Sequence, residues 1–505
     1  MSGEQSTAQK LFKSSVSRTL LMVANIGVSF FMTPFIIGKL GDEWYGIWVI
    51  LGTMVGYYYL IDMGMATAVT RYMSHYIAKK ETESANRVIN TSLVIYCLMA
   101  AVIILATVVI GYMAEYLVTD PGKLYIIRTS ILVIGLNLAI EFPLKAFSGI
   151  IGAYVRYDLL AYGHFFTLVL NTALTVFFLN RGHGVLTLFI IVFVCNQISN
   201  LIFYFVSRRL FKGMRIGLKY FEREKVRDLF GYSIWSFLNQ IGDQVRFKID
   251  SFVIVWLLTA GHVTHYVIGA RLAEYFMSLV LRATNMLVPV FTRLHAEGNH
   301  EEIRNKLLFM TKVNAVLAVF GGGVIMIVGR PFIARWMGDG YLDAYPVLVV
   351  LTISVMVEII QTPANNILYA ISRHKYLAYV NVAEAAVNLV LSIVLIKRYG
   401  LIGAAIGTAV PLVISRFFII PLYAGRCVGL GMSRYYRNLF VTGFYTAAYM
   451  AVLFILSRGL LSTPSYASIL LVGIASVPVY LVSIMYISFT KSERALIRTM
   501  LPLRG

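Results

Sequence analysis

Charged and amide side chains recur at helical spacing inside two apolar stretches of the sequence. One stretch, near residues 230–257, carries Asn239, Asp243, Arg246 and Asp250 at intervals of 4, 3 and 4. The other, near 265–290, carries Arg271, Glu274, Ser278, Arg282 and Asn285 at intervals of 3, 4, 4 and 3. Such intervals place side chains on one face of an α-helix. Because a charge in hydrocarbon is costly, these faces are expected to line a charged, water-filled cavity.

The arginines on these faces indicate which ligand such a cavity would hold. Arg246, Arg271 and Arg282 carry planar guanidinium groups, which bind phosphate oxygens in bidentate fashion. We therefore predict an anion-binding site, with Arg18 of the first apolar run as a further member. The amide and hydroxyl groups predicted to line the same cavity belong to Asn25, Asn239, Asn365, Tyr369 and Asn381.

Five carboxylates in apolar stretches are candidates for coupling to H+ or Na+: Asp62, Glu141, Asp250, Glu358 and Glu384. A desolvated carboxyl group takes up a proton more readily, and a nearby arginine opposes this. No basic neighbour is evident in the sequence for Glu358 or Glu384. The alternative is structural pairing, for example of Glu141 with Lys145 at i,i+4 or of Arg271 with Glu274. The asparagines could likewise hold helices together by hydrogen bonds.

Signs of enzymatic chemistry are missing from the sequence. It contains no GxxxxGK[ST] phosphate loop, and its eight histidines are scattered. No long outward loop carries an acid/base pair. We therefore expect no catalytic residues, no metal site and no cofactor, and we expect that the protein is not an enzyme.

Composition places the chain in a membrane. Of its 505 residues 59% are hydrophobic and only 13% are charged, whereas soluble chains carry roughly 25% charged residues. The formal net charge is +20, but the basic residues lie between apolar stretches, which favours a membrane protein over a partner of nucleic acid.

Fourteen stretches are apolar and long enough to cross about 30 Å of hydrocarbon. They lie near 19–39, 44–70, 88–113, 124–150, 159–179, 185–206, 230–257, 265–290, 313–330, 345–371, 376–396, 401–424, 438–457 and 466–489. If the N-terminus is cytoplasmic, the inward segments hold about three times as many Lys and Arg as the outward ones. We predict a multi-pass protein of the cytoplasmic (inner) membrane with both termini in the cytoplasm.

The sequence also repeats itself. Residues 156–162 (RYDLLAY) match 373–379 (RHKYLAY) at an offset of 217 residues. Six spans per half preserve direction, so the predicted fold is all-α, with two six-helix lobes related by a parallel repeat plus two C-terminal helices. The expected boundaries are 1–206 for the N-terminal lobe, 207–229 for a basic cytoplasmic linker, 230–424 for the C-terminal lobe and 425–505 for the last two spans and the tail. In such a plan the substrate site lies between the halves.

Short motifs along nearly the whole chain resemble those of the polysaccharide flippases (Wzx-type, O-antigen). The residues that carry the resemblance are Leu40–Gly46, Leu60–Gly64 with Arg71, Lys248–Asp250, Tyr266–Arg271 with Pro289 and Arg293, Asn366–Ala370 with Arg373–Lys375, and Tyr399–Thr408.

The resemblance implies the fold of the multidrug/oligosaccharidyl-lipid/polysaccharide exporter superfamily, working by alternating access. It implies a substrate built from polyprenyl lipid, pyrophosphate and oligosaccharide, flipped to the outer leaflet, with H+ or Na+ as coupling ion and membrane lipid and the polysaccharide polymerase and chain-length machinery as partners. The arginines would then hold pyrophosphate and Tyr369 would meet sugars. Alternatives are a multidrug or organic-cation exporter, a peptidoglycan-precursor flippase, a polyprenyl-dependent membrane enzyme and a non-transporting scaffold.

Overall fold

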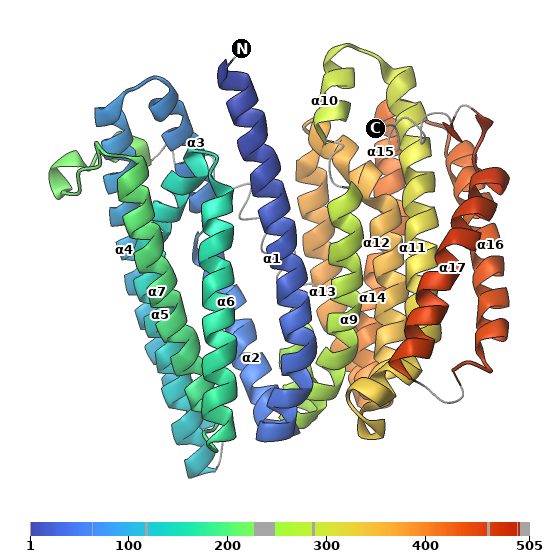
Figure 1. The fold of residues 1–505 in the computed structure, drawn as a ribbon, viewed down its shortest axis with the longest axis horizontal. Coiled ribbons are helices and arrows are strands. Elements are labelled where there is room, and N and C mark those ends of the chain that lie inside the picture. Colours follow the sequence, from blue (N-terminus) through green and yellow to red (C-terminus); the bar gives the residue numbers. More distant parts are fainter. Residues whose placement is uncertain are drawn as a thin grey trace. The chain divides into compact units, whose positions relative to one another are not determined.

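Helices make up almost all of the described chain (Figure 1). The structure, a computed structural model, describes residues 2–62, 64–116, 120–226, 248–284, 288–461, 465–491 and 493–494, apart from the side chains of 2–12, 116, 282–284 and 374. The chain forms two compact units, Met1–Gln244 and Val245–Gly505.

The first unit is a bundle of long helices. Its elements are α1 (Ser2–Leu40), α2 (Asp42–Tyr59), the 3-10 turn η1 (Leu60–Asp62), α3 (Met65–Ala78), α4 (Thr82–Met113), η2 (Ala114–Tyr116), α5 (Pro121–Ala153), α6 (Tyr157–Asn180), α7 (Val185–Leu210) and η3 (Leu218–Tyr220). Helix α5 lies at its centre, packed against α3, α4 and α7, while α1 packs against α6.

The second unit is a bundle centred on α12. Its elements are α9 (Ala260–Thr284), α10 (Val288–Ala296), α11 (His300–Trp336), η4 (Asp339–Tyr341), α12 (Ala344–Ala370), α13 (His374–Tyr399), α14 (Leu401–Ile414), the π-turn η5 (Ser415–Ile419), α15 (Ile420–Val428), α16 (Met432–Ser457) and α17 (Tyr466–Ile487). Residues 248–257 are also helical. Helices α9, α11 and α14 pack against α12, whereas α16 and α17 pack against α11 at one edge of this unit (Figure 1).

Twelve helical segments of the described chain are long and apolar enough to cross a membrane. They coincide with twelve of the fourteen predicted spans, so the polytopic all-α prediction is confirmed. Predicted span 230–257 lies largely outside the described residues. Predicted span 265–290 falls on α9 and the start of α10, and α9, which carries Arg271, Glu274 and Arg282, is not among the twelve.

Predicted span 44–70 is interrupted near its end. Helix α2 ends at Tyr59 and α3 begins at Met65, with Gly64 between them at φ 76°. This left-handed backbone costs glycine little and interrupts a helix of ordinary residues. The break leaves Asp62 at the end of the apolar segment, next to a turn.

Several helix ends follow directly from local sequence. Asp120 caps α5 by accepting hydrogen bonds from the backbone N–H of Gly122 and Lys123, and Pro121 occupies the first helical position. Ser465 forms a capping box with Ser468 at the start of α17.

Two asparagines of α4 hold the start of the basic linker. Asn86 donates to the carbonyl of Gly213 (2.9 Å) and accepts from the N–H of Arg215 (2.8 Å). One turn further, Asn90 makes the same pair of bonds with Arg215 and Gly217 (2.7 and 2.8 Å). Both asparagines are buried, so the linker starts as an ordered segment against α4.

The sequence repeat has a structural counterpart in one turn. Val155 (φ 58°) precedes α6 and Ser372 (φ 60°) precedes α13, exactly 217 residues apart and both left-handed. In each turn the next residue, Arg156 or Arg373, donates its N–H five residues back, with N···O distances of 3.2 and 2.8 Å. A left-handed conformation is rare for non-glycine residues and rarer still for a β-branched one. Its recurrence shows that this local turn repeats, while the relation of whole lobes stays a prediction.

Replacing Val155 by glycine should stabilise the protein, because glycine removes the steric cost of the left-handed backbone. The net gain expected is about 1 kcal/mol after the added freedom of the unfolded chain, and Ser372→Gly should gain less. Thermal unfolding of detergent-purified protein measures the effect. Ala153→Gly, at a right-handed helical position, is the control and should lower the melting temperature; a drop for Val155→Gly as well would contradict the assignment.

Candidate functional site

A buried carboxylate in the second unit is held by three hydroxyl groups. Asp250 is 2% exposed. It accepts hydrogen bonds from Tyr266 Oη and Thr408 Oγ1, both at 2.6 Å, and Ser392 Oγ lies 3.3 Å from its other oxygen. The groups in contact with it among the described residues are neutral. Burial disfavours the charged form of such a carboxyl group, whereas hydrogen bonds from hydroxyl donors favour it.

Close packing of α13 against α14 brings these hydroxyls together. Gly407 faces Ser392 so closely that a Cβ atom there would lie 2.7 Å from the Ser392 nitrogen. Asn388 extends the network, since its amide donates to Thr408 Oγ1 and its oxygen lies near Ser392 Oγ, both at 3.1 Å. The single proton of Ser392 can therefore serve either Asp250 or Asn388. A change of charge at Asp250 would rearrange this chain of hydrogen bonds.

A second buried cluster surrounds Arg416, which lies in the π-turn between α14 and α15. Arg416 is 3% exposed. Its guanidinium donates to Glu358 of α12 and to Asn381 of α13 (3.0 Å), and it lies 3.9 Å from Glu384. Ser415 donates to the same Glu384. Among the described residues, one arginine thus faces two carboxylates.

The expectation that Glu358 and Glu384 lack a basic neighbour was therefore wrong. Arg416 is 58 residues from Glu358 and 32 from Glu384 in the chain, and only the packing of α12, α13 and the π-turn joins them. A signal for Arg416 was present, because it is a charge inside an apolar stretch. Sequence reasoning also missed Tyr266, Ser392 and Thr408, whose neutral side chains are common in helices.

The first unit has its own charged cluster around Lys145. Lys145 of α5 lies 3.9 Å from Asp62, and its ammonium sits above the rings of Tyr59 and Phe142, 3.9 and 4.4 Å from their centres. Glu141 instead accepts a hydrogen bond from Tyr59 Oη at 2.7 Å. The predicted i,i+4 partner of Lys145 is thus replaced by Asp62. Likewise Glu274 pairs with Lys248 (3.1 Å), not with Arg271.

The remaining predicted residues are more scattered. Arg18 and Asn25 are exposed on α1; Arg18 lies 5.0 Å from the Tyr157 ring and Asn25 donates to Leu21 O. Arg271 is half-buried on α9, and Tyr369 is 44% exposed on α12. Asn365 is half-buried, and its side-chain oxygen has no hydrogen-bond partner among the described residues. Asn239, Arg246 and the side chain of Arg282 lie outside the described residues.

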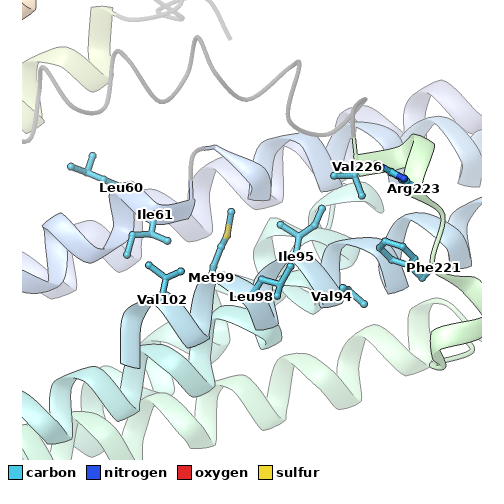
Figure 2. A pocket seen from close by; sticks show the side chains of 10 residues that line it. All are labelled: Leu60, Ile61, Val94, Ile95, Leu98, Met99, Val102, Phe221, Arg223 and Val226. Atoms are coloured by element: carbon cyan, nitrogen blue, oxygen red, sulfur yellow. The ribbon is translucent and has the colours of Figure 1, made fainter. Parts of the chain in front are cut away.

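An apolar cavity of about 710 Å³ opens in the first unit. Figure 2 shows side chains from one face of α4, including Ile95, Met99 and Val102, reaching towards Leu60 and Ile61. Phe221 and Arg223 of the linker stand at the far end. Among the described residues, the cavity offers hydrocarbon contacts along its length and the cation of Arg223 at its end.

Comparison with known proteins identifies the family. The family described as polysaccharide biosynthesis proteins matches residues 11–295. The chain belongs to this family. An uncharacterized membrane protein, EpsK, of Bacillus subtilis (strain 168) is 23% identical over 504 residues, covering 96% of both chains. A candidate O-antigen transporter of Shigella flexneri is 21% identical, covering 81% of this chain and 95% of its own.

A solved structure of the lipid II flippase MurJ in an inward closed conformation has the same fold. It superposes with a TM-score of 0.68 at 13% identity, covering 94% of this chain and 98% of its own. The polysaccharide-family protein therefore has a multi-pass helical fold that it shares with the MurJ structure. Three motifs behind the resemblance to flippases also meet in space, because Asp250, Tyr266 and Thr408 come one from each and share hydrogen bonds.

Removing Arg416 should destabilise the protein strongly, since the carboxylates of Glu358 and Glu384 would lose the guanidinium group that they face. Arg416→Met should cost about 3 kcal/mol or more. Adding Glu358→Gln and Glu384→Gln should restore most of the loss, because no unpaired charge remains. Thermal unfolding in detergent provides the measurement. Arg426→Met, at an exposed position of α15, is the matched control; equal melting temperatures for both arginine variants would refute the buried cluster.

Proposed function

We propose that this transporter flips polyprenyl-pyrophosphate-linked oligosaccharide units from the cytoplasmic to the outer leaflet, for assembly of a surface polysaccharide. It would act by alternating access in the cytoplasmic membrane, with both termini in the cytoplasm. The observation that carries the proposal is that both units hold ionisable side chains in the interior of apolar helices, in a chain of the polysaccharide family.

The described residues supply contacts for each part of such a substrate. Arg271 on α9 would meet phosphate oxygens, which arginine binds through parallel N–H groups. The exposed ring of Tyr369 offers a face and a hydroxyl to sugars. The apolar cavity beside α4 matches a prenyl chain in chemistry, with Arg223 near its end.

We further propose that transport is coupled to H+ or Na+ through Asp250. Three hydroxyl oxygens and one carboxylate provide the hard oxygen ligands that a small cation prefers, and the same carboxylate could instead carry a proton. Ion binding would alter the hydrogen-bond chain through Ser392, Asn388 and Thr408. Because this chain joins α13 to α14, occupancy at Asp250 would bias their packing.

Arg271→Ala should abolish outward exposure of lipid-linked glycan, because a phosphate contact is lost. In a strain lacking the protein, a membrane-impermeant glycan probe scores each leaflet after complementation. Wild type should restore outward exposure and Arg271→Ala should not, at equal protein level. Arg293→Ala is the matched control, since this arginine is exposed on α10 and pairs with Glu297.

An unchanged leaflet distribution in the deletion strain would overturn the glycan substrate. Loss of resistance to organic cations in that strain would then indicate a multidrug exporter. Accumulation of peptidoglycan precursor would indicate the other alternative substrate. Normal exposure with Arg271→Ala, but not with the deletion, would remove only that residue from the site.

Asp250→Asn should abolish ion dependence while the protein still folds, because asparagine keeps the shape of the carboxyl group without its charge. Thermal stability of purified protein is measured in NaCl, KCl and choline chloride at several pH values. Stabilisation by Na+ that also falls with Thr408→Val would identify a sodium site, whereas a pH effect insensitive to Na+ would identify a proton site. Identical ion and pH responses of wild type and Asp250→Asn would contradict coupling through this group.

A further inference from the structure

A pocket of about 740 Å³ lies in the second unit, between the start of α11, the start of α16 and the segment that follows α17. Val290 of α10 contributes to its wall. The candidate membrane span of α16 begins at Met432, and that of α17 ends at Ile487. The pocket therefore lies at one boundary of the membrane, where lipid head groups are found.

Four basic side chains line this pocket in the described part of the chain. Two of them have no acidic partner there. Lys306 pairs with Glu302 (3.1 Å), and Lys312, only 6% exposed, pairs with Glu493 (3.0 Å). Arg434 and Arg437 are exposed and make no hydrogen bond or ion pair with the described residues. Since the two lysines are neutralised by the two glutamates, the pocket keeps a net charge of about two, carried by the arginines.

The orientation of these arginines is fixed by hydrogen bonds that two neighbouring side chains of α16 make. Tyr435 is buried, and its hydroxyl donates to Gln361 of α12 at 2.5 Å. Asn438 donates to the carbonyl of Leu308 on α11 at 3.3 Å. Arg434, Arg437 and Asn438 are spaced by three and four residues, so they lie along one helix face towards the pocket.

The same face becomes apolar one turn deeper. Val441 lies on α16 about 10 Å from Arg434 along the axis, and Phe309 and Met310 of α11 line the pocket beside it. The closing side is ordered by the Lys312–Glu493 pair, and Glu493 also accepts from the backbone N–H of Thr490 at 2.8 Å. Burial raises the pKa of Glu493, but the hydrogen bonds from Thr490 and Lys312 outweigh it and leave the pKa below its usual value. The carboxyl group of Glu493 is therefore ionised at neutral pH.

We propose that this pocket binds an anionic phospholipid of the adjacent leaflet, with its phosphate held by Arg434 and Arg437 and an acyl chain along Val441 and Phe309. The argument for this occupant is charge complementarity at the head-group level together with an apolar wall on the membrane side. Basic pockets between transmembrane helices bind anionic head groups in this way. The lipid would join α11, α16 and the C-terminal segment, far along the chain from Asp250.

Binding of phosphatidylglycerol to the full-length protein tests this proposal. Native mass spectrometry of detergent-purified protein gives the affinity for the first bound phosphatidylglycerol, with phosphatidylcholine of the same acyl chains as reference. Arg434→Gln combined with Arg437→Gln should weaken phosphatidylglycerol binding roughly thirtyfold and phosphatidylcholine binding much less, because the choline group already compensates its phosphate charge. Arg208→Gln with Arg209→Gln, which removes the same charge from the exposed end of α7, is the matched control and should stay within about twofold of wild type.

Three results would overturn the proposal. Equal losses in both double variants would mean a general surface charge effect. Displacement of phosphatidylglycerol by inorganic phosphate at similar concentration would mean a free-anion site. Much stronger displacement by polyprenyl pyrophosphate would assign the pocket to the transported lipid. If the glutamine variant fails to fold, Arg434→Lys with Arg437→Lys keeps the charge and should still weaken binding, because bidentate contacts are lost. Glycan flipping is measured in a separate assay. A failure of the proposed lipid site can therefore be told apart from a failure of the proposed flippase function.

Discussion

Hydrocarbon offers no hydrogen-bond partner, so each polar group within a membrane span needs one inside the protein. Three clusters in this transporter meet that requirement in different ways. Asp250 is surrounded by hydroxyl groups, Arg416 by two carboxylates and an amide, and Lys145 by one carboxylate and two aromatic rings. The helices that carry these groups come from distant parts of the chain, and the clusters therefore specify which helices must be neighbours.

The backbone adapts to these clusters at a few positions. The absence of a side chain at Gly407 lets α14 approach α13, so that Ser392 and Thr408 both reach one carboxylate. The π-turn at Ser415–Ile419 places Ser415 and Arg416 against the acidic residues of α12 and α13. Such turns interrupt the regular helical ladder and are frequent at functional sites. Packing and electrostatics are thus linked at the same two helices.

The two kinds of charged region differ in their surroundings and in their role. Clusters inside the spans surround each charged group with hydrogen-bond donors or with groups of opposite charge, as low dielectric demands. Basic residues at the span ends remain exposed, where Arg434 and Arg437 offer binding capacity to anions from the membrane surface. The basic linker shows a third solution, because Asn86 and Asn90 order its first residues through backbone hydrogen bonds. The proposed transport, coupling and lipid-binding roles would therefore occupy separate parts of the chain.

Hydropathy alone was enough to determine an all-helical, polytopic protein, because an apolar stretch of about 20 residues has few alternatives to crossing a membrane. Helical spacing also identified Asp250, Glu358 and Glu384 as buried carboxylates of interest. Their partners were decided by tertiary structure. Arg416 and Thr408 are 32 and 158 residues from the carboxylates Glu384 and Asp250 that they contact. No periodicity within one helix encodes such a pairing, since it depends on which helix faces are pressed together and on the glycine and π-turn that allow it.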